Sequence, residues 1–182
     1  MKKLSVLLSL CLFLCGCSAA NSKITPICRS LSFNAEINYQ NQPFEFSVTI
    51  NDNGDTLIKS KKEGYSVEFS GMGVNLKYGD LVYKTELSAL PDDFKLDLLH
   101  TVFSDISENK PTVISKNDEY FVEGKTEKYK FKVFLGLSGL PIKLTEDNNN
   151  ISIIISNAKV LWTLAFFIFF HWKKCRNMYN YL

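Results

Sequence analysis

A chain of 182 residues is long enough for one domain with a buried core. Apolar residues make up 46% of it and charged residues 22%, which is ordinary for a globular protein. Five of the 21 lysine and arginine residues lie in the first three and the last ten positions, and all 19 acidic residues lie between them, so the body has a net charge of about −3. A mildly acidic body lacks the positive surface that nucleic-acid binding requires, so no nucleic-acid partner is expected.

The chain begins with the pattern of a bacterial export signal. Two lysines precede an uncharged apolar run that is too short to span a bilayer stably. The letters LCGC that end this run resemble a lipobox, in which the last cysteine is acylated and becomes the mature N-terminus. We therefore expect a signal peptide at residues 1–16, lipidation of Cys17, and an anchor linker at residues 17–30. The expected location is the extracytoplasmic face of the cell membrane, with the membrane as a partner through the acylated Cys17.

Two alternatives for these cysteines are a metal site and an export signal without lipidation. Zinc or iron–sulfur ligation would need a second pair at ligand spacing, whereas Cys28, His100, His171 and Cys175 are isolated from one another in sequence. No metal and no cofactor are therefore expected. Cys28 would be the single thiol of the exported body, which leaves no partner for an intramolecular disulfide there.

The body is expected to be a succession of β-strands, each with one apolar and one polar face. From Leu31 onward apolar and polar residues alternate, which is typical of strands with one buried face. Asn53-Gly54 predicts a two-residue hairpin turn, since both residues tolerate positive φ. We expect strands at about residues 31–39, 44–50, 56–60, 65–70, 74–78, 81–87, 112–115, 119–124, 129–135, 142–146 and 151–156.

One helix interrupts the strands, at about residues 92–108. Pro91 suits a first helical position, Asp92 and Asp93 suit the positive end of the helix dipole, and apolar residues recur every four positions from Phe94. His100 lies outside the main apolar stripe, so we expect it to be partly exposed. Short connections favour antiparallel neighbours, which predicts a meander of about ten to eleven strands.

The sizes of these elements do not match. Ten strands spaced at about 4.8 Å make a sheet roughly 45 Å wide, whereas a helix of about 16 residues is roughly 24 Å long and 10 Å across. One helix cannot cover such a face. The sheet must therefore curl around the helix, fold over into a sandwich, or enclose a cavity that an apolar ligand fills.

The order of elements resembles the LolA-like superfamily, and most closely its lipid-anchored Gram-positive members. The resemblance lies in the lipobox, the strand pair FNAEINYQNQPFEFSVTI, the stretch SGMGVNLKYGDLVYKTELSALP before a single central helix, and a late GLSGLPIKL, and it covers residues 31–159. It implies a mainly β fold (α+β), in which a strongly curved antiparallel sheet forms an incomplete barrel with a helix packed on the concave face. It also implies binding of an acyl chain or another apolar molecule, without catalysis. The short region at residues 19–30 and the chain's own anchor depart from the soluble carriers, so shuttling of lipoproteins is not expected.

The expected ligand site lies between the sheet and the helix, and its candidate lining residues are Phe33, Ile37, Phe46, Val48, Phe69, Leu98 and Val102. The alternative is that this interior is only core. The chain would then be a packed structural or interaction module of the cell envelope, with another envelope protein as its partner.

No stretch of the chain has the pattern of a catalytic site. The letters GLSG at residues 136–139 lack the spacing of a hydrolase elbow and read as a turn. Residues 51–55 resemble part of a calcium loop but lack its distal glutamate, and a hairpin turn explains them. Helix-start placement accounts for Asp92 and Asp93 better than an acid/base pair.

The last residues differ in composition from the body. At residues 160–182 an apolar run of 13 residues precedes a basic end, and that run is short of the ~20 residues that a membrane helix needs. Two readings stay open for this tail: a short membrane segment with its basic end in the cytoplasm, or an altered reading frame.

Overall fold

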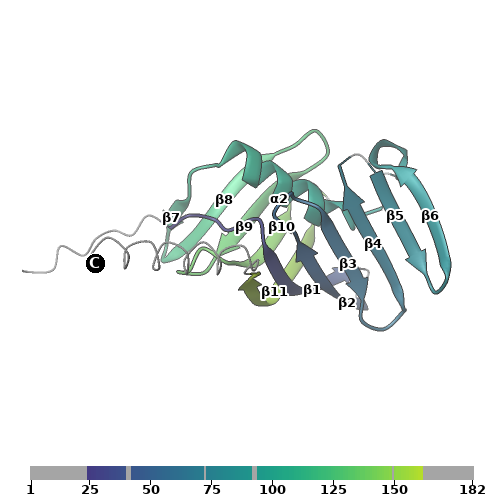
Figure 1. Cartoon of the computed structure of the whole chain (residues 1–182). Helices are drawn as coiled ribbons and strands as arrows, with labels where there is room; N and C mark the ends of the chain where they lie inside the picture. Colours follow the sequence, from purple (N-terminus) through teal and green to yellow (C-terminus); the bar gives the residue numbers. More distant parts are fainter. Residues whose placement is uncertain (1–23, 40–41, 72, 92–93, 149, 162–182) are drawn as a thin grey trace, which may run out of the picture.

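The computed structural model describes residues 24–39, 42–71, 73–91, 94–148 and 150–161. These residues form an open, curved antiparallel sheet of eleven strands, with one α-helix lying across one face (Figure 1). The predicted fold class, a mainly β protein with an open antiparallel sheet and one helix, is confirmed. The predicted signal peptide, the predicted lipidation site at Cys17 and nearly all of the tail lie outside the described residues.

The strands differ little from those expected from sequence. They are β1 (Leu31–Tyr39), β2 (Gln42–Ile50), β3 (Thr56–Ser60), β4 (Tyr65–Ser70), β5 (Gly73–Tyr78), β6 (Leu81–Glu86), β7 (Ile114–Lys116), β8 (Glu119–Lys125), β9 (Lys130–Leu135), β10 (Pro141–Glu146) and β11 (Ile151–Val160). A short 3₁₀ helix, η1 (Leu87–Ala89), follows β6.

The strand order differs from a single meander. It runs β6-β5-β4-β3-β2-β1-β11-β10-β9-β8-β7, so two meanders join where the first strand pairs with the last. Leu31 lies opposite Val160 and Ile37 lies opposite Ile153 in this central pair. The outer edges of the sheet, β6 and β7, are therefore consecutive in the chain, and the helix connects one edge to the other. The alternation of apolar and polar residues identifies each strand, but it does not predict the order of the strands in the sheet.

The helix α2 (Asp97–Asn109) begins later than the sequence predicted. The Phe94 N–H donates to the Pro91 carbonyl over 2.9 Å, which is a turn rather than a helical hydrogen bond. Asp92 and Asp93 lie outside the described residues. At the other end Lys110 adopts a left-handed conformation with φ of 45° and stops the helix. Among the described residues, no helix combines the length and the apolar character needed to cross a membrane.

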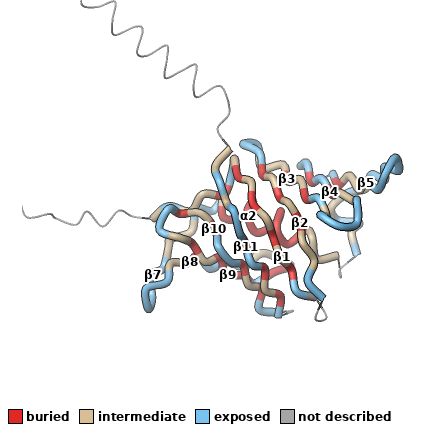
Figure 2. Tube along the Cα trace, turned by 90° about the horizontal axis from the view of Figure 1, so that it is seen from below, coloured by how far each residue is buried: buried red, intermediate tan, exposed pale blue. Residues whose placement is uncertain are grey.

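The core lies between α2 and the middle of the sheet, where buried positions concentrate (Figure 2). Alternate residues of each central strand face the helix, as the period of two predicts. From the helix side Leu98, Leu99, Val102, Phe103 and Ile106 are all buried. The Phe33 and Phe103 rings meet at a centroid distance of 5.6 Å.

The turn after β2 differs in type from the prediction. The Gly54 N–H donates to the Asn51 carbonyl and the Asn51 N–H donates to the Asp55 carbonyl, and in this turn only Gly54 has positive φ, at 90°. Residues 52–54 thus form the loop between Asn51 and Asp55, and the predicted two-residue loop Asn53-Gly54 is wrong. The Asn53 side chain accepts a hydrogen bond from the Asp55 N–H and donates one to the Asp55 carboxylate, and these bonds stabilise the turn that forms.

Candidate functional site

The seven predicted lining residues are all buried, but they occupy two different surroundings. Phe33, Val48, Phe69, Leu98 and Val102 belong to the packed core beneath the helix, and each is at most 2% exposed. Ile37 and Phe46 are also buried and line a small pocket of about 160 Å³ at the N-terminal end of α2. That these seven side chains contact a ligand stays a prediction.

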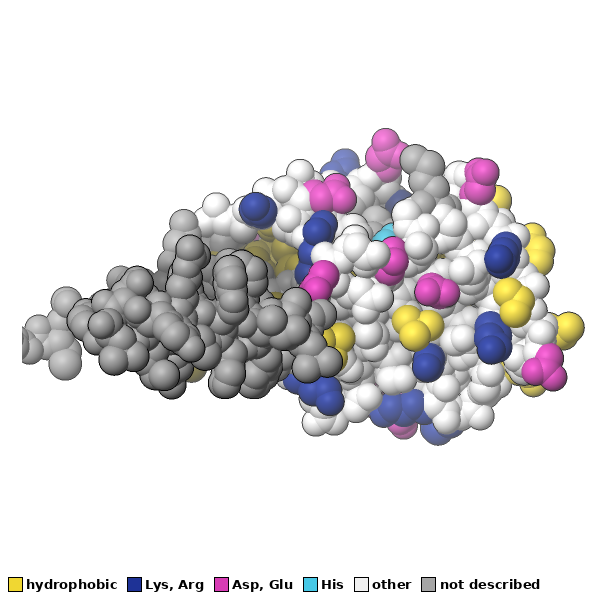
Figure 3. Space-filling model, in the orientation of Figure 1, with side chains coloured by type: hydrophobic (Ala, Val, Ile, Leu, Met, Phe, Trp, Pro, Cys, Tyr) yellow, Lys and Arg dark blue, Asp and Glu magenta, His cyan; other side chains and the backbone are white. Residues whose placement is uncertain are grey.

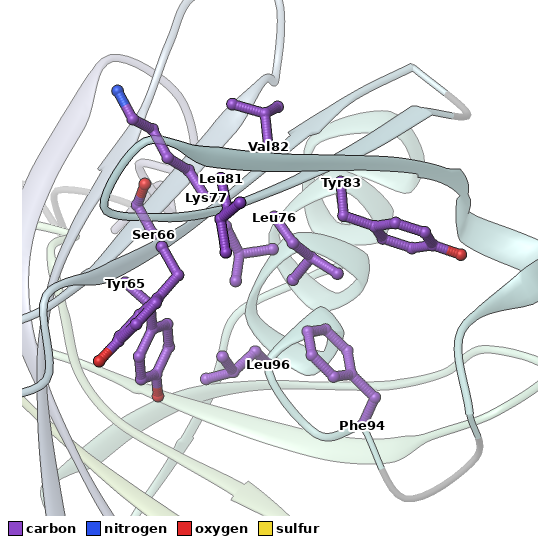
Figure 4. A pocket seen from close by; sticks show the side chains of 11 residues that line it. Tyr65, Ser66, Leu76, Lys77, Leu81, Val82, Tyr83, Phe94 and Leu96 are labelled. Atoms are coloured by element: carbon purple, nitrogen blue, oxygen red, sulfur yellow. The ribbon is translucent and has the colours of Figure 1, made fainter.

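A larger open space lies beside the helix, where the sheet extends past it. We call it the wing trough: a pocket of about 620 Å³ between β4–β6 on one side and the segment at residues 94–96 on the other. Figure 4 shows Leu76, Leu81, Tyr83, Phe94 and Leu96 pointing into this space. The residues that line the trough are Tyr65, Ser66, Val67, Leu76, Lys77, Tyr78, Leu81, Val82, Tyr83, Phe94 and Leu96.

Strand pairing explains why the trough is apolar. Leu76 lies opposite both Val67 and Tyr83, so these three side chains share one face of the sheet. Lys77, one residue further along β5, lies opposite Val82 on the other face of the sheet. Both residues border the trough, but their side chains point away from it (Figure 4). The polar residues that alternate with these apolar ones along the strands therefore face away from the trough.

Exposure rises along this face as the sheet leaves the helix. Val67 in β4 is buried, Leu76 in β5 is half-buried, and Leu81 and Tyr83 in β6 are 74% and 63% exposed. The helix α2, of 13 residues, starts after the segment at residues 94–96 and is too short to cover these outer strands as well. The size mismatch expected from the sequence is thus real, and it leaves uncovered apolar surface at the β6 end rather than beneath the helix.

Tyr65 and Leu96 line both the wing trough and the small pocket and so stand between them. The Tyr65 ring packs edge-on against Phe46 at a centroid distance of 6.2 Å. Burial raises the pKa of Tyr65, and the nearby Glu63 carboxylate raises it further. The phenol therefore stays neutral at physiological pH and adds no charge to this boundary.

Contacts of the buried Asp97 hold in place the wall of the trough that residues 94–96 form. Asp97, the first residue of α2, is 3% exposed. The Tyr129 hydroxyl donates to its Oδ1 over 2.5 Å, and Lys128 Nζ lies 2.9 Å from its Oδ2. Because a buried carboxylate is stable only when hydrogen-bonded and paired, these contacts hold the helix start against the turn before β9.

His100 is a correction to the sequence analysis. It was expected to be partly exposed, but it is 8% exposed and stacks on Phe69 at a centroid distance of 5.0 Å. Its Nδ1 lies 3.1 Å from Thr56 Oγ1. Burial lowers the pKa of His100, although nearby carboxylates including Asp55 oppose this shift. The imidazole fills core space that the four-residue stripe of the helix leaves open.

Sequence reasoning missed most of the wing trough. Tyr78, Leu81 and Tyr83 belong to strands that were identified correctly, but their exposure depends on how far the helix reaches. Phe94 was expected on the buried face of the helix. Because the helix begins only at Asp97, Phe94 precedes it and its side chain points into the trough instead. The sequence does carry a signal for the trough in the hairpin around Gly79-Asp80, where Leu76, Tyr78, Leu81 and Tyr83 share one face.

A second pocket of about 570 Å³ lies at the opposite end of α2, between the segment Ile24–Arg29 and residues 106–113. It is more polar, and Arg29 and Lys110 are among its lining residues. Burial raises the pKa of the Cys28 thiol to about 12, so this thiol stays protonated. Within the described ranges, no three His, Cys, Asp or Glu side chains lie close enough together to hold a metal ion.

Comparison with known proteins gives weak likeness only. No protein-family model and no curated protein matches the chain. Among solved structures, a LolA superfamily protein from Nitrosomonas europaea is similar with a TM-score of 0.45 and 13% identity, over 76% of this chain and 89% of that one. PNGF-II is similar with a TM-score of 0.35 and 11% identity, over 74% of this chain and 29% of that one. Scores below 0.5 do not assign the chain to either fold family.

Proposed function

We propose that this chain is a lipid-anchored extracytoplasmic binding protein that holds an apolar or acyl-chain ligand in the wing trough. In this proposal Cys17 is the acylated residue, the described domain lies outside the cytoplasmic membrane, and the chain is an anchored member of the LolA-like superfamily. It has no catalytic role and needs no cofactor.

One observation carries the proposal: an open apolar pocket of about 620 Å³ where the sheet extends beyond its helix. Ligand pockets in proteins range from about 300 to 1,000 Å³. Such a surface is costly to leave in water, because each buried methylene is worth about 0.8 kcal/mol. An acyl chain that occupied the trough would therefore gain about 8 kcal/mol, before entropic losses, from ten buried methylenes.

The chemistry of the lining supports a chain-like apolar ligand over a charged one. Leu76, Leu81 and Phe94 point into the trough, whereas Lys77 points away from it (Figure 4). A ligand with a charge deep in this space would lose hydration without gaining a partner. The polar end of the ligand is thus expected at the open mouth.

A second candidate function, a packed envelope module without a small ligand, is favoured by the buried residues beneath the helix. Phe33, Val48 and Phe69 are buried there in one hydrophobic cluster with the residues of α2. The two functions differ in what the wing trough does, so the test is directed at the trough.

The test compares two substitutions at neighbouring positions of β5. Leu76→Glu places a carboxylate in the trough, and Lys77→Glu places the same group on the opposite face. Binding of a fluorescent 16-carbon fatty acid is measured by titration, and folding is checked by circular dichroism. We expect Leu76→Glu to weaken binding at least about tenfold and Lys77→Glu to change it less than about twofold, since only the first buries an unpaired charge.

Lipid extraction of the purified wild-type protein followed by mass spectrometry supplies an independent measurement. A co-purifying acyl lipid that is lost in Leu76→Glu supports the proposal. A ligand-free wild type that also fails to bind the fatty acid refutes it and favours the packed envelope module.

A further inference from the structure

The edge strand β6 is unusually exposed and apolar. Among the described residues, eight large hydrophobic side chains are exposed, and four of them lie between Tyr78 and Tyr83 in the β5–β6 hairpin. In the space-filling view, hydrophobic side chains gather with lysines at this end of the molecule (Figure 3). The opposite edge, β7, has three residues, which limits pairing with another chain.

The backbone of β6 offers free hydrogen-bonding groups on one side. Tyr78 and Leu81 close the hairpin across the two-residue loop Gly79-Asp80, and such a closing pair exchanges both backbone hydrogen bonds. Because these groups alternate in direction, Leu81 and Tyr83 turn their backbone groups toward β5. Val82 and Lys84 turn theirs toward the free edge, where a further strand would add.

The side chains favour one register for antiparallel pairing of β6 with a second β6. With Val82 opposite Val82 of the second copy, Leu81 lies opposite Tyr83 on the trough face. On the outer face Asp80, the loop residue just before β6, then comes to lie beside Lys84 of the other copy, twice by symmetry. Asp80 and Lys84 are exposed, and neither takes part in an ion pair among the described residues. Apolar and opposite-charge cross-strand pairs each stabilise a sheet.

The neighbouring registers lack this complementarity. Centring the pair on Tyr83 places Asp80 opposite Glu86, which repel each other. Centring it on Lys84 places the two Lys84 side chains opposite one another. Like charges directly opposite destabilise a sheet, so the sequence of β6 specifies the Val82-centred register.

We propose that the protein forms a homodimer through β6, with the two strands antiparallel about a two-fold axis at Val82. The partner is a second copy of this chain because the edge is complementary to itself in sequence, charge and backbone direction. The two sheets then continue as one, and both wing troughs open on the same face. Leu81 and Tyr83 of the two copies form the floor where the troughs meet. This inference does not depend on what the trough binds.

Disulfide trapping in the full-length protein tests the register. In the Val82→Cys variant the two new cysteines would lie about 5.5 Å apart between Cα atoms, within disulfide reach. In the matched Lys84→Cys variant they would lie about 14 Å apart, out of reach. Under mild oxidation we expect a covalent dimer for Val82→Cys and none above the wild-type background for Lys84→Cys. Equal trapping of both variants, or of neither, overturns the proposal.

Charge exchange tests the same interface without a new thiol. Lys84→Asp places like charges opposite each other at two positions, and we expect it to weaken the dimer about tenfold, measured by sedimentation equilibrium in mild detergent. The double variant Asp80→Lys with Lys84→Asp exchanges the partners and restores the affinity. A wild type that stays monomeric up to about 100 µM, or a double variant as weak as the single one, overturns the proposal.

Discussion

Replacing Tyr129 by phenylalanine tests how the structure holds the start of α2. The substitution keeps the buried ring and removes the hydroxyl that donates to Asp97 over 2.5 Å. Both side chains are buried, at 1% and 3% exposure, so water cannot replace the lost donor without opening the core. Lys128 still pairs with the other carboxylate oxygen, so Asp97 keeps its ion-pair partner.

A hydrogen bond to a charged group contributes about 1.5–3 kcal/mol to stability. We therefore expect Tyr129→Phe to lower the free energy of unfolding by about 2 kcal/mol. For a chain of this size that corresponds to a fall of about 4–8 °C in the melting temperature. Urea denaturation monitored by circular dichroism measures the change directly.

Tyr120→Phe is the matched control, because Tyr120 is only half-buried and lies in β8 away from Asp97. We expect this control to change stability by less than about 0.5 kcal/mol. A double-mutant cycle of Tyr129→Phe with Asp97→Ala should give a coupling energy of about 1.5 kcal/mol. If Tyr129→Phe matches the control, or if the coupling is absent, the contacts of Asp97 do not hold the helix start as described.

Three further outcomes are expected. Burial lowers the pKa of His100, so the unfolded chain takes up a proton at a higher pH than the folded chain, and stability falls as pH drops below about 6.5. His100→Gln should reduce this loss by at most about 1.4 kcal/mol per pH unit, and parallel pH profiles for the two proteins would contradict this. Gly139→Ala should lower the free energy of unfolding by more than about 2 kcal/mol, because the new Cβ would collide with the Thr25 carbonyl and the residue has a φ of 80°. Gly54→Ala, which has open space around it, should lower it by about 1 kcal/mol, and urea denaturation measures both changes. Cys17→Ser should abolish incorporation of a labelled fatty acid into the protein, and unchanged incorporation would exclude acylation at Cys17.

Sequence periodicity was sufficient to predict the strands, the single helix and a mainly β fold. A strand with one buried face has a period of two whatever its neighbours are, so residues such as Phe33, Val48 and Phe69 could be assigned to the inner face from their spacing alone. The pairing of β1 with β11 could not be predicted in this way. It depends on contacts between residues more than a hundred positions apart, and these leave no local pattern.

The sequence placed the candidate lining residues between the sheet and the helix, and the structure adds an open apolar pocket farther along the sheet. The sequence argument compared the areas of sheet and helix correctly, yet it could not say which strands the helix covers. That choice depends on where α2 begins, and the Asp97–Tyr129 contact that fixes the beginning joins residues 32 positions apart. His100 was misassigned for a related reason, because its partners Thr56 and Phe69 lie on distant strands.

The central pairing of β1 with β11 also sets the order in which the polypeptide can fold. Each half of the sheet is built from neighbouring hairpins that close short loops and form fast. The junction between the halves cannot form until residues near 160 have been synthesised, because β1 waits for its partner on that side. Until then the inner edge of the first half is unpaired, so a nascent chain stopped before β11 remains open to aggregation.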